Sequence, residues 1–144
     1  ELLRCAVRAA SLEFDDCPGF LALAADAGPE ERAYAEFLAG RWQGLDARLL
    51  PEAQRAVVAG NAGLPADPLS LLVAAGVLLR NGKITPAGIA AAIDAASANG
   101  WRRPLLAWLG VEEKRAAAAG DADAAARIRR RIALVAGQSP GGDK

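Results

Sequence analysis

Prolines and glycines divide this chain into short segments with helical hydrophobic spacing. Proline fits the first turn of an α-helix, because the N–H group that it lacks would have no partner there. Glycine often ends a helix, because it readily adopts the left-handed backbone conformation that follows the last turn. Asp67 and Thr85 stand directly before Pro68 and Pro86 and are suitable N-cap residues. About a quarter of the residues are alanine and runs of β-branched residues are absent, so the chain is predicted to be helical nearly throughout, with no β-strand.

These signals predict a series of short helices and their place in the core. The predicted helices are Leu2–Glu13, Gly19–Asp26, Glu30–Trp42, Glu52–Ala59, Leu69–Asn81, Ala87–Asn99, Arg102–Ala119 and Ala122–Ala136. The segment Leu69–Asn81 is apolar around most of its circumference, so we expect it at the centre of the core. The helices over 87–99 and 122–136 each carry a single apolar stripe, so we expect both on the outside of the fold.

The chain has the length of one ordinary domain, at 144 residues. The short connections favour an irregular or orthogonal arrangement over long parallel rods. We therefore expect an all-α, single-domain bundle of about seven to nine short helices over residues 1–137, followed by a flexible tail at 138–144. Segments 104–119 and 121–136 have the character of a helical hairpin, but no second copy precedes them, so we do not expect a repeat array.

Composition and charge exclude several classes of protein. A hydrophobic fraction of 53% excludes a disordered chain, and two cysteines are too few for a disulfide-dense mini-protein. Seventeen basic and seventeen acidic residues cancel, so no global charge attracts nucleic acid or an anionic membrane surface. The strongest apolar run without charge, Leu69–Leu79, is far shorter than the roughly 20 residues that cross a bilayer, so we expect no membrane span.

The residue types that most enzymes need are scarce. The chain has no histidine, which removes the usual general base, the commonest metal ligand and every catalytic triad that needs imidazole. Glu13, Asp15 and Asp16 form the densest acidic cluster, but their spacing does not match a calcium loop, and we interpret them as a solvated turn. We therefore expect no enzymatic activity, no cofactor and no metal site. The alternative is a carboxylate-based enzyme or a small-ligand pocket in the helical core.

The two cysteines bear on the compartment. A bond between Cys5 and Cys17 would remove about 3 kcal/mol of unfolded-chain freedom, and it predicts an oxidising compartment such as the periplasm or another exported location. The alternative is a pair of buried free thiols, which would fit a cytoplasmic protein. The chain begins at Glu1 and contains no methionine, so we expect a processed or trimmed product, with which a removed signal peptide is compatible.

Trp101, Arg102, Arg103 and Trp108 are the first candidate partner-binding residues, because tryptophan and arginine concentrate binding energy at interfaces. Trp101 and Trp108 are seven residues apart, so both indoles can share one face if the helix begins early enough. The alternative is that Trp108 belongs to the core and Trp101 packs over the end of the preceding helix.

The last predicted helix carries the second candidate set, Arg127, Arg130 and Arg131, with Arg129 beside them. A basic face of this kind binds an acidic protein partner or phosphate groups. A solvated face is the simpler interpretation, because no aromatic residue lies among the arginines.

These observations together predict a non-enzymatic protein-interaction domain of the adaptor, chaperone or inhibitor type, in a bacterial cell envelope. The alternative is an intracellular regulator that binds nucleic acid or an acidic partner through the arginine-rich helix.

Overall fold

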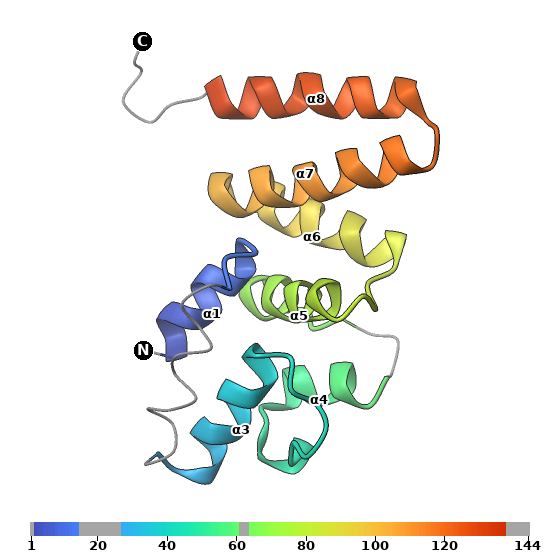
Figure 1. Cartoon of the computed structure of the whole chain (residues 1–144). Coiled ribbons are helices and arrows are strands. Elements are labelled where there is room, and N and C mark those ends of the chain that lie inside the picture. Colours follow the sequence, from blue (N-terminus) through green and yellow to red (C-terminus); the bar gives the residue numbers. More distant parts are fainter. Residues whose placement is uncertain (1, 15–26, 61–63, 138–144) are drawn as a thin grey trace.

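The computed structural model describes residues 2–14, 27–60 and 64–137. Within these ranges the protein forms seven α-helices, one 3-10 helix and no strand, so the all-α prediction is confirmed. The elements are α1 (Leu2–Ala10), α3 (Pro29–Leu38), η1 (the 3-10 helix Ala47–Leu49), α4 (Glu52–Val58), α5 (Pro68–Arg80), α6 (Pro86–Ala98), α7 (Arg102–Ala118) and α8 (Ala122–Gly137) (Figure 1). The predicted helix Gly19–Asp26 and the predicted tail 138–144 lie outside the described residues.

The helix starts follow the sequence signals. The Asp67 carboxylate accepts a hydrogen bond from the Ser70 backbone N–H at 2.9 Å, at the start of α5. The Thr85 hydroxyl accepts one from the Gly88 backbone N–H at 3.1 Å, at the start of α6. Both predicted N-caps are therefore confirmed, and each satisfies an N–H group that has no partner within its own helix.

Two helices end earlier than predicted. α1 ends at Ala10 instead of Glu13, because the backbone turns at Leu12, whose φ of 63° lies in the left-handed region. α3 ends before the predicted Trp42, because Gly40 adopts a left-handed φ of 72° after its last turn. Gly40 is therefore a helix stop that the sequence analysis missed.

The helices are arranged in layers along one axis. In Figure 1, α8, α7, α6 and α5 follow one another from the top downwards, α1 lies beside α5, and α3 and α4 lie at the far end. Helices that are neighbours in the stack make the most extensive tertiary contacts. These pairs are α7 with α8, α6 with α7, and α5 with both α1 and α6. This arrangement is a layered stack, and it does not confirm the bundle that we expected.

α5 occupies the middle of the stack, as its apolar circumference predicts. Six consecutive residues, Leu72 to Val77, are buried, and α5 packs against α1, α3, α4 and α6. Gly76 allows the contact with α1, because a Cβ atom at this position would lie 2.8 Å from the Ala9 carbonyl oxygen.

α6 does not lie on the outside, so this prediction is wrong. It packs between α5 and α7, and Ala92 and Ala96 are fully buried. Alanine is small enough for a second helix to approach closely, which the single stripe of larger residues did not reveal. α8 does lie at the outside, with Ala125 as its only buried residue.

Candidate functional site

A groove between α1 and the start of α7 is the candidate functional site, and we call it the α1–α7 groove. It has a volume of about 430 Å³. Its described lining consists of Val7, Ala10, Ser11, Leu69, Trp101, Arg102, Arg103 and Pro104. The surface inside the groove is mainly apolar, and it brings together residues that lie more than 90 positions apart in the sequence.

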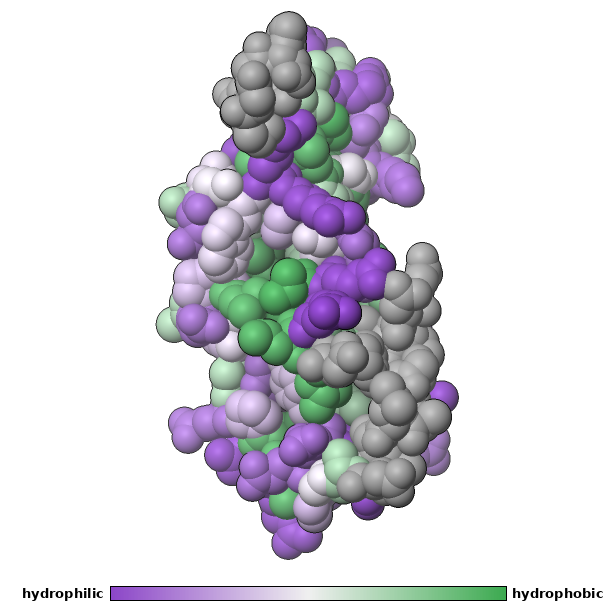
Figure 2. Space-filling model, turned by 90° about the vertical axis from the view of Figure 1, so that its left-hand side faces the viewer, coloured by the Kyte–Doolittle hydropathy of each residue, from purple (hydrophilic) through white to green (hydrophobic). Residues whose placement is uncertain are grey.

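Two exposed hydrophobic side chains extend the groove along α1. Leu3 is 69% exposed and Val7 is 51% exposed, and they lie one helical turn apart. Figure 2 shows the side of the molecule that lies on the left in Figure 1. Hydrophobic side chains gather near the middle of this side, at the height where α1 lies in Figure 1. The opposite side of α1, with Cys5 and Ala9, is buried in the core. α1 is therefore apolar on two sides, only one of which the described fold covers.

The start of α7 forms the second wall of the groove. Trp101 is the N-cap residue of α7, with φ −86° and ψ 87°, and its backbone N–H donates to the Ala96 carbonyl at 3.0 Å. Pro104 lies in the first turn, where its missing N–H would have had no partner within the helix. The chain therefore passes tightly from α6 into α7, and the half-buried Trp101 side chain lies at the edge of the groove.

Two arginines of the groove contact residues of other parts of the fold. Arg102 Nη2 donates to the Ala136 carbonyl in the last turn of α8 at 3.0 Å, where a cation also complements the helix dipole. Its Nε–H is buried and has no hydrogen-bond partner among the described residues. Arg103 Nε lies 2.8 Å from Glu13 Oε2, and Glu13 Oε1 lies 3.6 Å from Arg8 Nε. Glu13 thus links the segment after α1 to the start of α7.

Trp108 does not contribute to this surface. Its side chain is fully buried in the core, and its indole N–H has no hydrogen-bond partner among the described residues. Trp101 precedes the first helical residue and has a non-helical ψ, so its side chain does not follow the helical register of α7. The expectation that both indoles are displayed on one exposed face is therefore wrong, and the alternative that places Trp108 in the core holds.

The arginines of α8 form a separate surface. Arg127, Arg129, Arg130 and Arg131 are all exposed. Arg129 Nη1 lies 3.2 Å from Glu113 Oε2, and Arg131 Nη2 donates to the Ser97 hydroxyl at 3.3 Å. Arg127 and Arg131 also line a shallow hollow that contains two carboxylates, Asp94 and Glu112. Charges of both signs therefore lie together here, which weakens the attraction for a chain of phosphates.

Glu112 itself is held in its charged form. A bidentate contact with Arg115, in which both N···O distances are 2.7 Å, lowers its pKa below the usual range of a glutamate. The contact joins residues three apart on the exposed side of α7, so it supports the helix.

The remaining predicted features fall partly outside the described residues. Cys5 is buried, but Cys17 lies outside the described residues, so the disulfide stays a prediction. Asp15 and Asp16 of the acidic cluster also lie outside them.

Among the described residues, no three histidine, cysteine, aspartate or glutamate side chains are grouped as metal ligands would be. None of the described helices combines the length and the hydropathy that crossing a bilayer requires.

Comparison of the chain with protein-family models, curated proteins and solved structures finds no match.

Proposed function

We propose that this protein is a non-enzymatic protein-interaction domain, and that the α1–α7 groove binds a short amphipathic helix of a partner polypeptide. One observation carries the proposal: the exposed Leu3 and Val7 lie on the same side of α1 and continue into an apolar groove. Single exposed hydrophobic residues are common on protein surfaces, whereas a continuous apolar patch beside a hollow is typical of a binding site.

The spacing and the charge of the site define the occupant. Leu3 and Val7 present two apolar side chains one turn apart, and such a row packs into the groove of another helix. Of the two arginines in the described lining, Arg103 already pairs with Glu13, whereas Arg102 donates only to a neutral carbonyl among the described residues, so an acidic residue beside the apolar stripe of the partner helix would complement Arg102. Covering a leucine or valine side chain contributes about 1.5–3 kcal/mol, so these two residues alone can supply a measurable part of the affinity.

The finer assignment is an adaptor, chaperone or inhibitor of a bacterial cell envelope. Its support is the pair of cysteines, since a Cys5–Cys17 bond would persist only outside a reducing cytosol. The alternative of a cytoplasmic regulator that binds an acidic partner through α8 has its support in the four exposed arginines.

Site-specific photocrosslinking tests the proposal. A photoreactive amino acid is placed at Val7 and, as the control, at Leu134, which is 70% exposed on α8. We expect the Val7 position to crosslink to one defined segment with an apolar stripe and acidic flanks, and the Leu134 position not to crosslink to it.

The affinity of a synthetic peptide of that segment then decides the question. We expect Leu3→Glu to lower the affinity for the peptide at least tenfold. Leu134→Glu should leave this affinity unchanged. Equal binding to both variants, or the same crosslinks from both positions, would refute the groove as the binding site.

A further inference from the structure

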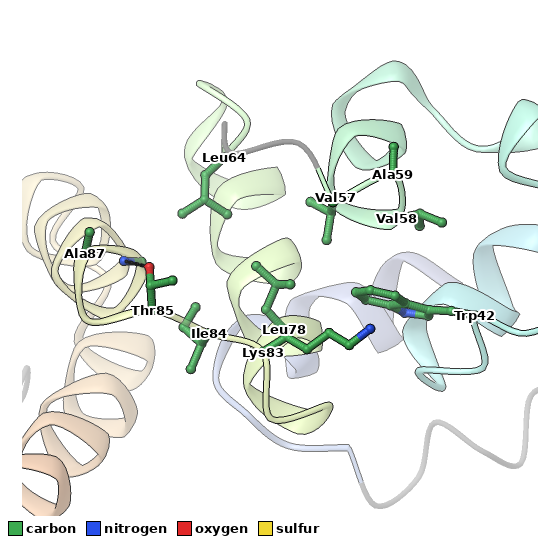
Figure 3. A pocket seen from close by; sticks show the side chains of 12 residues that line it. Trp42, Val57, Val58, Ala59, Leu64, Leu78, Lys83, Ile84, Thr85 and Ala87 are labelled. Atoms are coloured by element: carbon green, nitrogen blue, oxygen red, sulfur yellow. Dashed lines mark hydrogen bonds between the residues drawn. The ribbon is translucent and has the colours of Figure 1, made fainter.

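A second hollow lies in another part of the stack, between α4 and the connection from α5 to α6. Its volume is about 450 Å³, which is the size of a site for a small organic molecule. Figure 3 shows α4 on one side of it and the turn with Lys83 and Ile84 on the other. It shares no described residue with the α1–α7 groove.

Most of the described walls of this pocket are apolar. In Figure 3, side chains from α4, from the segment before α5 and from the end of α5 converge on the same space. The apolar lining residues with large side chains are Trp42, Val57, Val58, Leu64, Leu78 and Ile84. Such walls favour a ligand with an aliphatic or aromatic body.

A single charged group borders the pocket in the part that the structure describes, and it is a cation. Lys83 Nζ lies 4.6 Å from the centre of the Trp42 ring, where the electron-rich face of the indole attracts it. The described lining contains no aspartate or glutamate, and no described residue forms an ion pair with Lys83. A carboxylate that enters the pocket would therefore meet a cation without competition from an acidic side chain in this lining.

Two further polar features lie near the pocket. Trp42 Nε1–H is buried and has no hydrogen-bond partner among the described residues. The first turn of α6, with Ala87 and Gly88, borders the same pocket and adds the positive end of a helix dipole.

We infer that this pocket binds a small organic carboxylate with an apolar body. The ligand places its body against Trp42, Leu78 and Ile84 and its carboxylate beside Lys83. This inference does not rest on the groove or on its polypeptide partner, so either proposal can fail while the other stands.

Nuclear magnetic resonance titration tests it, because the three tryptophans give three separate indole N–H signals. The probes are 3-phenylpropionate and its uncharged amide, 3-phenylpropanamide. We expect the Trp42 signal to shift with saturation on addition of the carboxylate, the signals of Trp101 and Trp108 to stay in place, and the amide to bind at least tenfold more weakly.

A matched pair of lysine variants isolates the charge. Lys83 and Lys114 are both exposed, so neither Lys83→Gln nor Lys114→Gln is expected to disturb the fold, as an unchanged Tm would confirm. We expect Lys83→Gln to lower the affinity for 3-phenylpropionate at least tenfold and Lys114→Gln to leave it unchanged. Absence of a saturable shift at millimolar ligand, or equal binding of the acid by both variants, would overturn the inference.

Discussion

The approach of α5 to α1 at Gly76 makes a sharp prediction about stability. Replacing a helical glycine with alanine stabilises a helix by about 0.5–1 kcal/mol when the new methyl group has room. At Gly76 it has none, because the added Cβ would lie 2.8 Å from the Ala9 carbonyl oxygen and 3.4 Å from Phe14 Cζ. Overpacking of this kind costs about 1–3 kcal/mol, so we expect Gly76→Ala to lower the free energy of unfolding by about 1 kcal/mol.

Gly110 provides the matched control, because it also lies within a helix, α7, and a Cβ there would meet nothing within 4 Å. We expect Gly110→Ala to raise the free energy of unfolding by about 0.5–1 kcal/mol. The propensity gain is the same in both variants, so their difference isolates the cost of the α1–α5 contact.

Urea unfolding and thermal unfolding, both followed by circular dichroism at 222 nm, measure the free energy of unfolding and the Tm of both variants. For a chain of this length, we expect Tm to fall by about 3–5 °C in Gly76→Ala and to rise by about 2–4 °C in Gly110→Ala. If Gly76→Ala were as stable as Gly110→Ala, the backbone of α1 would not lie against α5, and the arrangement around the middle of the stack would be refuted.

Three further predictions concern the caps and the cysteines. Thr85→Ala removes the acceptor for the Gly88 N–H, so we expect thermal unfolding to show a loss of about 1 kcal/mol, whereas Thr85→Ser should retain most of the stability. The hydrogen bond from Ser70 lowers the pKa of Asp67 in the folded protein, so its contribution is present above the unfolded pKa of about 3.9 and is lost as the pH falls through the folded value. The Tm deficit of Asp67→Ala at pH 7 should therefore shrink below about pH 4, and a deficit that stays constant at acid pH would contradict the cap. In unreduced, denatured protein from its native cell, alkylation with mass analysis should find no free thiol at Cys5 or Cys17, whereas two labelled thiols would favour the cytoplasmic alternative.

The helices could be predicted from local signals because their ends depend on local chemistry. Proline, glycine and the capping side chains act within one turn, so the starts of α5 and α6 agree with the sequence to within one residue. Leu12 shows where this reasoning stops, because a leucine in the left-handed region gives no signal in the sequence. Its side chain packs against the core near Gly76, a contact that the sequence does not show.

The position of α6 could not be predicted from hydropathy. Alanine is compatible with both buried and exposed positions, so a helix as rich in alanine as α6 shows a narrow apolar stripe even when neighbours cover it on two sides. Ala92 and Ala96 are fully buried because α5 and α7 approach closely, and that closeness is a property of the pair of neighbours.

The candidate groove was predictable only in part. Trp101, Arg102 and Arg103 stood out by residue type, and all three line the groove. Leu3 and Val7 were missed, although one signal was present: α1 has apolar residues on both sides, more than a helix with a single buried face needs. The groove itself depends on the fold that brings α1 beside the start of α7.

The layered stack also sets how the molecule opens. When each layer contacts mainly its neighbours, unfolding can begin at an end without disrupting the middle, and stability is distributed in steps along the chain. α8 has one buried residue, so its amides should exchange with solvent first and those of α5 last. Arg102 joins the last turn of α8 to the wall of the α1–α7 groove. The free energy of opening α8 is therefore coupled to the occupancy of the groove. We expect a helix bound in the groove to slow hydrogen exchange in the last turn of α8, which Arg102 joins to the groove wall.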